Sequence, residues 1–227
     1  MTPDPNAPDL SGRVVVVTGA AGRLGRVTAE HLAAAGARVA GLDREPHDVG
    51  DASLVADATD EAATADALAA VAGGLGEPDA LVHAVGMWAG APFAETSLAD
   101  WRSVMDVNLT SAFVAFRAAA RRMVGASGGR LVALASGQGA DRGVAQQAAY
   151  SAAKAGVVRL VEAVADELRS QNVTAAAVAP SMILFGDEPE GTRGVDVGEI
   201  ARLCVTLCGP AGAVHSGSVV QAYGSMR

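Results

Sequence analysis

The chain has 227 residues, half of them hydrophobic and 19% charged, which is enough apolar material for a buried core and argues against a disordered protein. The formal net charge of −8 argues against nucleic-acid binding, because contacts to phosphates need a basic face. No apolar run approaches the roughly 18 residues of a membrane span. The N-terminus lacks the basic and apolar regions of a signal peptide, so we expect a cytoplasmic protein with no membrane partner.

Short valine-rich runs alternate along the chain with longer alanine-rich segments. Strands are expected at residues 13–18, 37–42, 53–56, 79–85, 130–135, 172–179 and 218–221. Helices are expected at residues 23–35, 60–71, 106–123, 149–169 and 198–208. This alternation predicts a parallel sheet with helices on both faces, in three layers. No linker or repeat divides the chain, so we expect one doubly wound α/β domain over residues 11–227, after a flexible tail at residues 1–10.

The helices carry apolar faces. In the helix at 106–123, the residues expected on one face are Leu109, Ala112, Phe113, Phe116, Ala120 and Met123. In the helix at 149–169 they are Val157, Leu160, Val161, Val164 and Leu168. Cys204 and Cys208 share a face of the last helix, because they are four residues apart. We expect buried free thiols there and no metal site, since the four histidines of the chain are scattered.

The stretch VVVVTGAAGRLGR, residues 14–26, joins the first strand to the first helix through a glycine-rich turn. Such a turn presents backbone N–H groups at the positive end of a helix, where the pyrophosphate of a dinucleotide binds. Gly19, Gly22 and Gly25 allow the backbone to approach the phosphates closely, which makes the expected fold Rossmann-like. The same glycines would also suit an ordinary tight turn between a strand and a helix.

An acidic residue follows the second strand. Asp43 stands 24 residues after Gly19, where a carboxylate accepts hydrogen bonds from the ribose hydroxyls of an adenosine and repels a 2′-phosphate. This position favours NAD(H) over NADP(H). Arg44 and Arg23 are the counterargument, because either guanidinium could pair with a 2′-phosphate. A solvated loop carboxylate is the alternative interpretation of Asp43.

The stretch YSAAKAG places Tyr150 and Lys154 four residues apart, on one face of the long helix. A nearby ammonium stabilises a phenolate and lowers the pKa of the tyrosine, which can then exchange a proton with a carbonyl or alcohol oxygen. Ser136 ends the preceding strand, at the sheet edge where ligands of α/β proteins bind. Asn108 is a polar residue on an otherwise apolar helix, where a hydrogen-bonded buried amide is the alternative to a functional role.

Together these features resemble the short-chain dehydrogenases/reductases, a family of compact single-domain enzymes, over nearly all of residues 11–227. TGAAGRLG at residues 18–25 matches the glycine motif, and VADATD, HAVG and VAPSMILF match three further segments. The residues at the four catalytic positions are Asn108, Ser136, Tyr150 and Lys154. The resemblance implies that a dinucleotide is held by Gly19, Arg23, Leu24, Asp43, Asp57, Ala58, His83, Ala84, Gly86, Tyr150, Lys154, Pro180 and Ile183.

The resemblance also implies a mechanism. Tyr150 is the acid/base, Lys154 lowers its pKa and holds the nicotinamide ribose, Ser136 orients the substrate oxygen and Asn108 supports a proton relay. Hydride passes between the nicotinamide and a carbonyl or alcohol carbon of a small substrate. Members of the family are usually homotetramers or homodimers packed through the helices that hold Asn108 and Tyr150, and the resemblance implies the same here.

Several positions depart from the family pattern. Arg23 replaces the middle glycine of the motif, His83 replaces an asparagine near the adenosine ribose, and AYGS at residues 222–225 replaces a common Asp-Gly-Gly. Two further departures are Ser181 and Phe185. The segment after Pro180 is short for a helical lid, which predicts an open or minimal substrate pocket. Candidates for its lining, each of which could instead be an ordinary surface residue, are Met87, Trp88, Gln138, Arg142, Gln146 and Met182.

Three functions are compatible with these residues. The first is an NAD(H)-dependent oxidoreductase that interconverts an alcohol and a ketone or aldehyde. The second is a non-catalytic module that senses a dinucleotide, which the departures on the nucleotide side would explain and the intact catalytic positions oppose. The third is a nucleotide-sugar epimerase with the same Tyr150 and Lys154, but the roughly 50 residues after Pro180 leave little room for the substrate domain such enzymes need.

Overall fold

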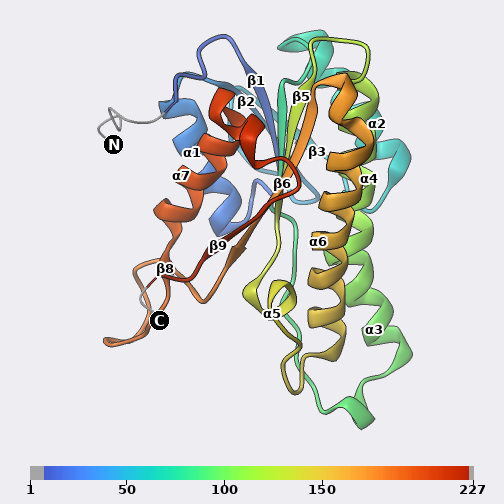
Figure 1. The fold of residues 1–227 in the computed structure, drawn as a ribbon, viewed down its shortest axis with the longest axis vertical. Helices are drawn as coiled ribbons and strands as arrows, with labels where there is room; N and C mark the ends of the chain where they lie inside the picture. The colour runs from blue at the N-terminus through green and yellow to red at the C-terminus, as the bar shows by residue number, and fades with distance from the viewer. Residues whose placement is uncertain (1–7, 225–227) are drawn as a thin grey trace.

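A computed structural model describes residues 8–224 as one parallel sheet between two helical layers (Figure 1). The strands of this sheet are β1 (Val14–Thr18), β2 (Arg38–Asp43), β3 (Ala52–Val55), β4 (Ala80–His83), β5 (Gly129–Leu134), β6 (Val173–Pro180) and β9 (Val219–Ala222). Their order is β3-β2-β1-β4-β5-β6-β9, and every neighbouring pair is parallel. Two short strands, β7 (Ile183–Leu184) and β8 (Val195–Asp196), pair apart from it. The predicted doubly wound, three-layer fold is confirmed.

The helical layers lie on opposite faces of the sheet. One face is covered by α1 (Arg23–Ala34) and α7 (Val197–Cys208), and the other by α2 (Glu61–Gly74), α4 (Ser111–Met123) and α6 (Ala148–Leu168) (Figure 1). The valines of β1 show why the strand is apolar throughout. Val15 and Val17 enter the core under α1 and α7, whereas Val14 and Val16 enter the core under α2, α4 and α6, because successive side chains of a strand point to opposite faces.

Shorter helical segments complete the chain. They are η1 (Phe93–Glu95), α3 (Leu98–Met105), the π turn η2 (Asp106–Thr110), α5 (Gly137–Ala140), η3 (Arg169–Gln171) and η4 (Pro210–His215). The helix expected at 106–123 therefore begins at Leu98, eight residues early, and passes through a π turn before α4. Ser97 caps its first turn by accepting from the N–H of Asp100. The sequence analysis missed this start and the four-residue α5, which is too short for a periodic pattern.

Two of the expected helix faces need correction. Phe113 is 46% exposed, because the buried side of α4 runs through Ala112, Ala115 and Phe116 and leaves Phe113 on the solvent side. In α6, Val157 and Val161 are buried as expected. The remaining members of the expected set are only partly buried; they are Leu160, Val164 and Leu168.

The N-terminal boundary also differs from the expectation. Residues 1–7 of the predicted tail lie outside the described range. Leu10, however, is fully buried in the core under α1 and α7, and its N–H donates to the carbonyl of Ala35. The packed domain thus begins before residue 11. Within the described residues no helix is long and apolar enough to span a membrane.

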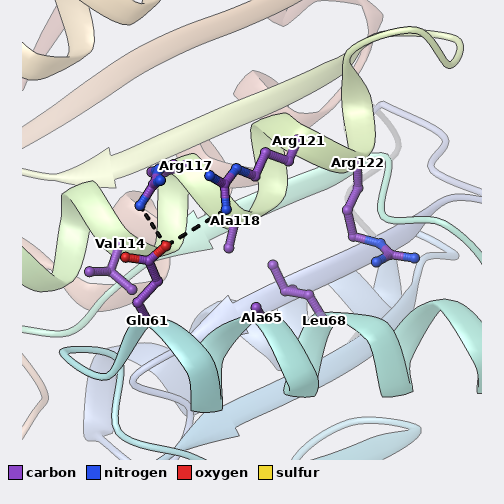
Figure 2. Close-up of a pocket in the computed structure, with 8 residues that line it drawn as sticks. All are labelled: Glu61, Ala65, Leu68, Val114, Arg117, Ala118, Arg121 and Arg122. Carbon is purple, nitrogen blue, oxygen red and sulfur yellow. Dashed lines mark hydrogen bonds and ion pairs between the residues drawn. The ribbon is translucent and has the colours of Figure 1, made fainter.

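Figure 2 shows a pocket between α2 and α4. Its volume is about 180 Å³, and the apolar side chains of Leu68 and Val114 form part of its wall. The carboxylate of Glu61 lies 2.6 Å from a guanidinium nitrogen of Arg117 and 3.7 Å from one of Arg121, so the charges at the rim are paired with one another. None of its lining residues belongs to the predicted site.

Candidate active site

The predicted catalytic residues meet where β4 and β5 end. Ser136 follows β5 and caps α5, its Oγ accepting from the N–H of Gln138 at 3.3 Å. Tyr150 and Lys154 lie on the first two turns of α6, and the side chain of Ser136 is near enough to Tyr150 to lower its pKa. Because carboxyl ends of parallel strands meet at one edge of a sheet, this is the edge at which α/β proteins bind ligands.

Lys154 is held inside the protein. It is 5% exposed, and its Nζ donates to the carbonyl oxygen of Leu134 at 2.8 Å. Two glycines make room for it. A Cβ on Gly139 would lie 2.6 Å from Cβ of Lys154, and a Cβ on Gly86 would lie 3.2 Å from its Nζ. The helices α5 and α6 therefore pack this closely only with glycine at position 139, whereas a Cβ on Gly86 would require the side chains of Asn108 and Lys154 to shift slightly.

Asn108 lies in the π turn and is completely buried. Its Nδ2 donates to the carbonyls of Val104 at 2.9 Å and Met87 at 3.0 Å, and its Oδ1 accepts from the N–H of Met87 at 3.2 Å. The buried amide is thus hydrogen-bonded at both ends and ties the loop after β4 to the helix. π turns are frequent at functional sites, and this one turns the side chain of Asn108 toward the site.

The titrating groups differ in part from the expectation. Burial raises the pKa of Tyr150 above its ordinary value of 10.0, and the hydrogen bond with Ser136 only partly offsets this. Burial also lowers the pKa of Lys154 to about 8. The lowering of the Tyr150 pKa by Lys154 is not seen here, because Nζ lies 6.0 Å from the ring centroid and donates to Leu134 instead.

The glycine turn has the geometry of a phosphate cradle. Gly19 has φ of +74°, and a Cβ there would lie 2.8 Å from the backbone carbon of Ala84. A Cβ on Gly25 would lie 2.0 Å from the oxygen of Gly19, so α1 can start this close only without one. Gly22 caps α1 and offers no side-chain oxygen to the N–H groups of its first turn, which includes Leu24. The turn therefore fits a dinucleotide pyrophosphate.

Asp43 stands beside this turn, at the end of β2. Its Oδ2 accepts from the N–H of Ala21 at 3.0 Å, and its Oδ1 accepts from the N–H of Glu45 at 3.0 Å. Each oxygen has a further lone pair, so this half-buried carboxylate fits hydroxyls of an adenosine ribose. On the neighbouring loop, Asp57 is exposed and accepts from the N–H and hydroxyl of Thr59, while Ala58 is buried.

Arg23 points across the molecule to the segment after β7. Its guanidinium lies 2.8 Å from Oδ1 of Asp187 and 4.0 Å from the ring centroid of Phe185. Both charged side chains are more than half exposed. Two residues that depart from the family pattern, Arg23 and Phe185, are therefore in contact with each other. In this conformation Arg23 is paired with Asp187.

The side chain of His83 is buried in the core, so the predicted contact of this residue with a cofactor stays a prediction for its backbone. Its ring is 1% exposed and lies in a buried chain of hydrogen bonds, with Nδ1 2.8 Å from the hydroxyl of Thr18 and Nε2 3.1 Å from that of Ser111. Ser111 in turn donates to the carbonyl of Val107. Nε2–H is therefore the donor to Ser111, and Nδ1 accepts from Thr18. Burial and the charge of Lys154 lower the pKa of His83 to about 3, so the ring is neutral.

The remaining predicted residues surround the same edge. Ala84 and Gly86 follow β4, Pro180 ends β6, and Ile183 begins β7. The candidates for pocket lining include three exposed apolar side chains, on Met87, Trp88 and Met182.

The other candidates lie in the loop after Ser136. Gln146 is in the left-handed region with φ of 63°, and its carbonyl accepts from Ala91, joining the two loops that border the site. Gln138 belongs to α5, and Arg142 is an exposed residue of the same loop. The cysteines, Cys204 and Cys208, are free and fully buried, as expected. No group of three potential ligands among His, Cys, Asp and Glu is placed to hold a metal in residues 8–224.

Sequence reasoning missed residues that contact this site from a distance. Tyr223, in the AYGS segment, lies against Gly137, and its hydroxyl donates to the carboxylate of Asp141. Gln221 donates to the same carboxylate at 2.6 Å. The departure of AYGS from the family pattern was the available signal, but 82 residues separate Tyr223 from Asp141, so no local pattern shows the pairing. Ser225 of that segment lies outside the described residues.

Comparisons with known proteins place the chain in a family. Residues 13–186 match the family model described as short chain dehydrogenase. The D-threitol dehydrogenase of Mycolicibacterium smegmatis is 35% identical, over 92% of this chain and 90% of its own. A 3-oxoacyl-[acyl-carrier-protein] reductase of Vibrio cholerae is 31% identical, over 96% and 98%. The structure of a putative gluconate dehydrogenase from Agrobacterium tumefaciens superposes with a TM-score of 0.88 at 31% identity, covering 96% of this chain and 97% of the other.

Proposed function

The chain belongs to the short-chain dehydrogenase family of oxidoreductases, and we propose that it interconverts an alcohol and a ketone or aldehyde with NAD(H). The observation that supports this most is the convergence of Ser136, Tyr150 and Lys154 at the carboxyl edge of the sheet, with Asn108 buried behind them. A non-catalytic sensing module would not need a tyrosine beside a serine at this edge. An epimerase would need more chain for its substrate than follows Pro180.

Each side chain has a role in this proposal. The hydroxyls of Ser136 and Tyr150 hold the substrate oxygen between them. In reduction Tyr150 donates its proton to that oxygen, and in oxidation it accepts the proton of the alcohol. The ammonium of Lys154 would hold the nicotinamide ribose, and it would favour the phenolate of Tyr150 once it leaves the carbonyl of Leu134, to which Nζ donates in this structure. Asn108 would support the relay that returns a proton to Lys154. The dinucleotide, when bound, supplies or accepts the hydride.

The same residues suggest how the dinucleotide is held. The turn at Gly19 and Leu24 would take the pyrophosphate, with Arg23 beside it, and Asp57 and Ala58 would contact the adenine. Backbone groups of Ala84 and Gly86 would border the adenosine and nicotinamide riboses. Pro180 and Ile183 would face the nicotinamide, next to Tyr150 and Lys154.

Asp43 supports a preference for NAD(H). Its carboxylate lies at the end of β2 beside the turn, where it accepts ribose hydroxyls and repels a 2′-phosphate. Of the two arginines that could oppose it, Arg23 is engaged with Asp187, and Arg44 lies 3.6 Å from Glu45. NADP(H) would need one of these pairs to break.

Substrate and assembly follow as parts of the same proposal. The activity named for the M. smegmatis relative makes a polyol a candidate substrate, and the name of the V. cholerae relative makes a carrier-bound 3-oxoacyl group another. We expect a homotetramer or homodimer packed through α4 and α6, where Phe113 is an exposed apolar side chain. Two free, buried thiols fit a reducing, cytoplasmic location.

A fluorescence titration of the purified protein with NADH and NADPH, followed by turnover assays on alcohols and carbonyls, tests the proposal. We expect micromolar binding of NADH and much weaker binding of NADPH. Tyr150→Phe should reduce kcat/KM by about 10³-fold or more and leave the NADH affinity unchanged, because only the proton donor is lost. Turnover by Tyr150→Phe at the wild-type rate would disprove this mechanism, and tight NADH binding without turnover would favour the sensing module.

A further inference from the structure

The end of β9 reaches across the end of β6 to the loop that carries Ser136. A Cβ on Gly137 would lie 3.0 Å from Cε1 and 3.1 Å from the hydroxyl oxygen of Tyr223, so the tyrosine ring packs against Gly137. Gly137 is the residue directly after Ser136. Tyr223 therefore packs against the residue that follows Ser136, the residue that holds the substrate oxygen in the proposed function.

Tyr223 is itself fixed in place. The hydroxyl of Ser181 donates to the carbonyl of Tyr223 at 3.0 Å, and the N–H of Ser181 donates to the carbonyl of Ala222 at 3.0 Å. The beginning of the segment after β6 and the end of β9 are thus joined. Ser181 and Tyr223, both departures from the family pattern, contact each other, and Tyr223 also contacts Gly137.

Asp141 receives donors from this strand. The carboxylate stands at the end of α5, and it accepts from the hydroxyl of Tyr223 at one oxygen and from the amide of Gln221 at the other. The side chain is thereby held in one orientation although the residue is exposed. A carboxylate oxygen has two acceptor sites, so one remains at each oxygen for a ligand.

The chemistry of this group restricts the substrate. An exposed carboxylate accepts a strong hydrogen bond from a hydroxyl group. An acyl chain lying over it would displace its water molecules and offer no hydrogen-bond donor in their place. The carboxylate of Asp141 would repel an anionic group placed against it, whereas Asp187 on the segment after β7 is already paired with Arg23. The exposed apolar side chains Met87 and Trp88 offer contact with a carbon skeleton but no acceptor for a hydroxyl.

We propose that Asp141, oriented by Tyr223 and Gln221, is a specificity-determining residue that accepts a hydrogen bond from a second hydroxyl of the substrate. The enzyme then prefers a neutral vicinal diol or polyol to the corresponding mono-alcohol. This inference rests on the proposed oxidoreductase function, since it concerns the substrate of the same site.

Matched substrate pairs test it. The kcat/KM for NAD⁺-dependent oxidation is measured for butane-2,3-diol against butan-2-ol and for cyclohexane-1,2-diol against cyclohexanol. A hydrogen bond to a charged acceptor predicts a preference for the diol of roughly 10- to 100-fold in the wild type. Asp141→Ala should bring this ratio close to one while the mono-alcohol is still oxidised. Asp141→Asn and Tyr223→Phe should give intermediate ratios, because each retains an acceptor but loses its charge or its fixed orientation.

The control is Asp166→Ala, which removes an exposed aspartate paired with Arg169 at the far end of α6 and should leave the ratio unchanged. NADH titration and thermal melting of each variant establish that it is folded and binds the cofactor. A wild-type ratio near one, or an unchanged ratio in Asp141→Ala, overturns the inference. So does an equal loss for diol and mono-alcohol in Asp141→Ala, which would show that Asp141 only supports α5. If the wild type oxidises none of the four alcohols and reduces none of the corresponding ketones, the proposed function itself fails.

Discussion

Two halves of the molecule differ in how far their residues depart from the family pattern. The nucleotide half consists of β1 to β3 with α1, and the catalytic half consists of β5 with α5 and α6. The nucleotide half departs from the family pattern at Arg23, and His83 at the end of β4 borders it. Both side chains have partners in the structure. Arg23 forms an exposed ion pair with Asp187 on the segment after β7, and His83 forms buried hydrogen bonds with Thr18 and Ser111. In the catalytic half, the residues that the sequence analysis matched to the four catalytic positions of the family show no such departure.

In the proposed function, the two halves of the site depend on different atoms. A pyrophosphate would be bound by backbone N–H groups, so a side chain at position 23 could change as long as the turn keeps its shape. Proton transfer would need particular side-chain groups, so the proposal allows no substitute for Tyr150 or Lys154. Three predictions test this contrast.

The largest effect is expected at Lys154. Its pKa is about 8 in the folded protein and 10.5 when unperturbed, so the unfolded chain binds more protons between these pH values and stability rises with pH across them. Below pH 8 burial of the ammonium costs on the order of 3 kcal/mol. Lys154→Met should reduce kcat/KM by at least about 10²-fold and yet raise the free energy of unfolding at pH 7.

Urea unfolding at pH 7 and pH 10 checks this prediction. The stability advantage of Lys154→Met should shrink at pH 10, where wild-type Lys154 is already neutral in the folded protein. Lys154→Leu serves as a second variant of similar volume. An equal advantage at both pH values would mean that packing, and not the charge, makes the difference.

An intermediate effect is expected at His83. Its pKa is about 3 in the folded protein and 6.5 when unperturbed, so stability is lost as pH falls from 6.5 toward 3. The loss amounts to about 2 kcal/mol between pH 6.5 and pH 5. His83→Asn should lack this loss and bind NADH like the wild type. Urea unfolding at pH 7 and pH 5 is the measurement, and parallel losses in both proteins would contradict the buried neutral ring.

The smallest effect is expected at the contact between Arg23 and Asp187. Both side chains are largely exposed, and neither substitution should change the urea midpoint measurably. Asp187→Asn should lower the Kd for NADH about two- to five-fold by freeing the guanidinium, and Arg23→Ala should raise it by a similar factor. Both shifts should shrink in 0.5 M NaCl. If neither substitution changes the Kd for NADH, Arg23 does not contribute to cofactor binding.

The sequence by itself determined the fold class, the approximate strand positions, and the placement of Tyr150 and Lys154 on one helix. These follow from local rules, since the alternation of apolar runs and a spacing of four residues act within one element. The early start of the helix before α4 was missed because Ser97 and the π turn at Asn108 leave no regular period.

Only the tertiary structure decided which distant side chains meet. Nothing in the sequence around His83 indicates that its ring contacts Thr18 and Ser111 in the core. Likewise, nothing around Arg23 indicates that its side chain reaches Asp187, 164 residues away. Asp141 and Tyr223 come together only because β9 lies beside β6 and ends near α5. Periodicity fixes which face of an element is buried, whereas the partner of a polar side chain depends on how the elements are stacked.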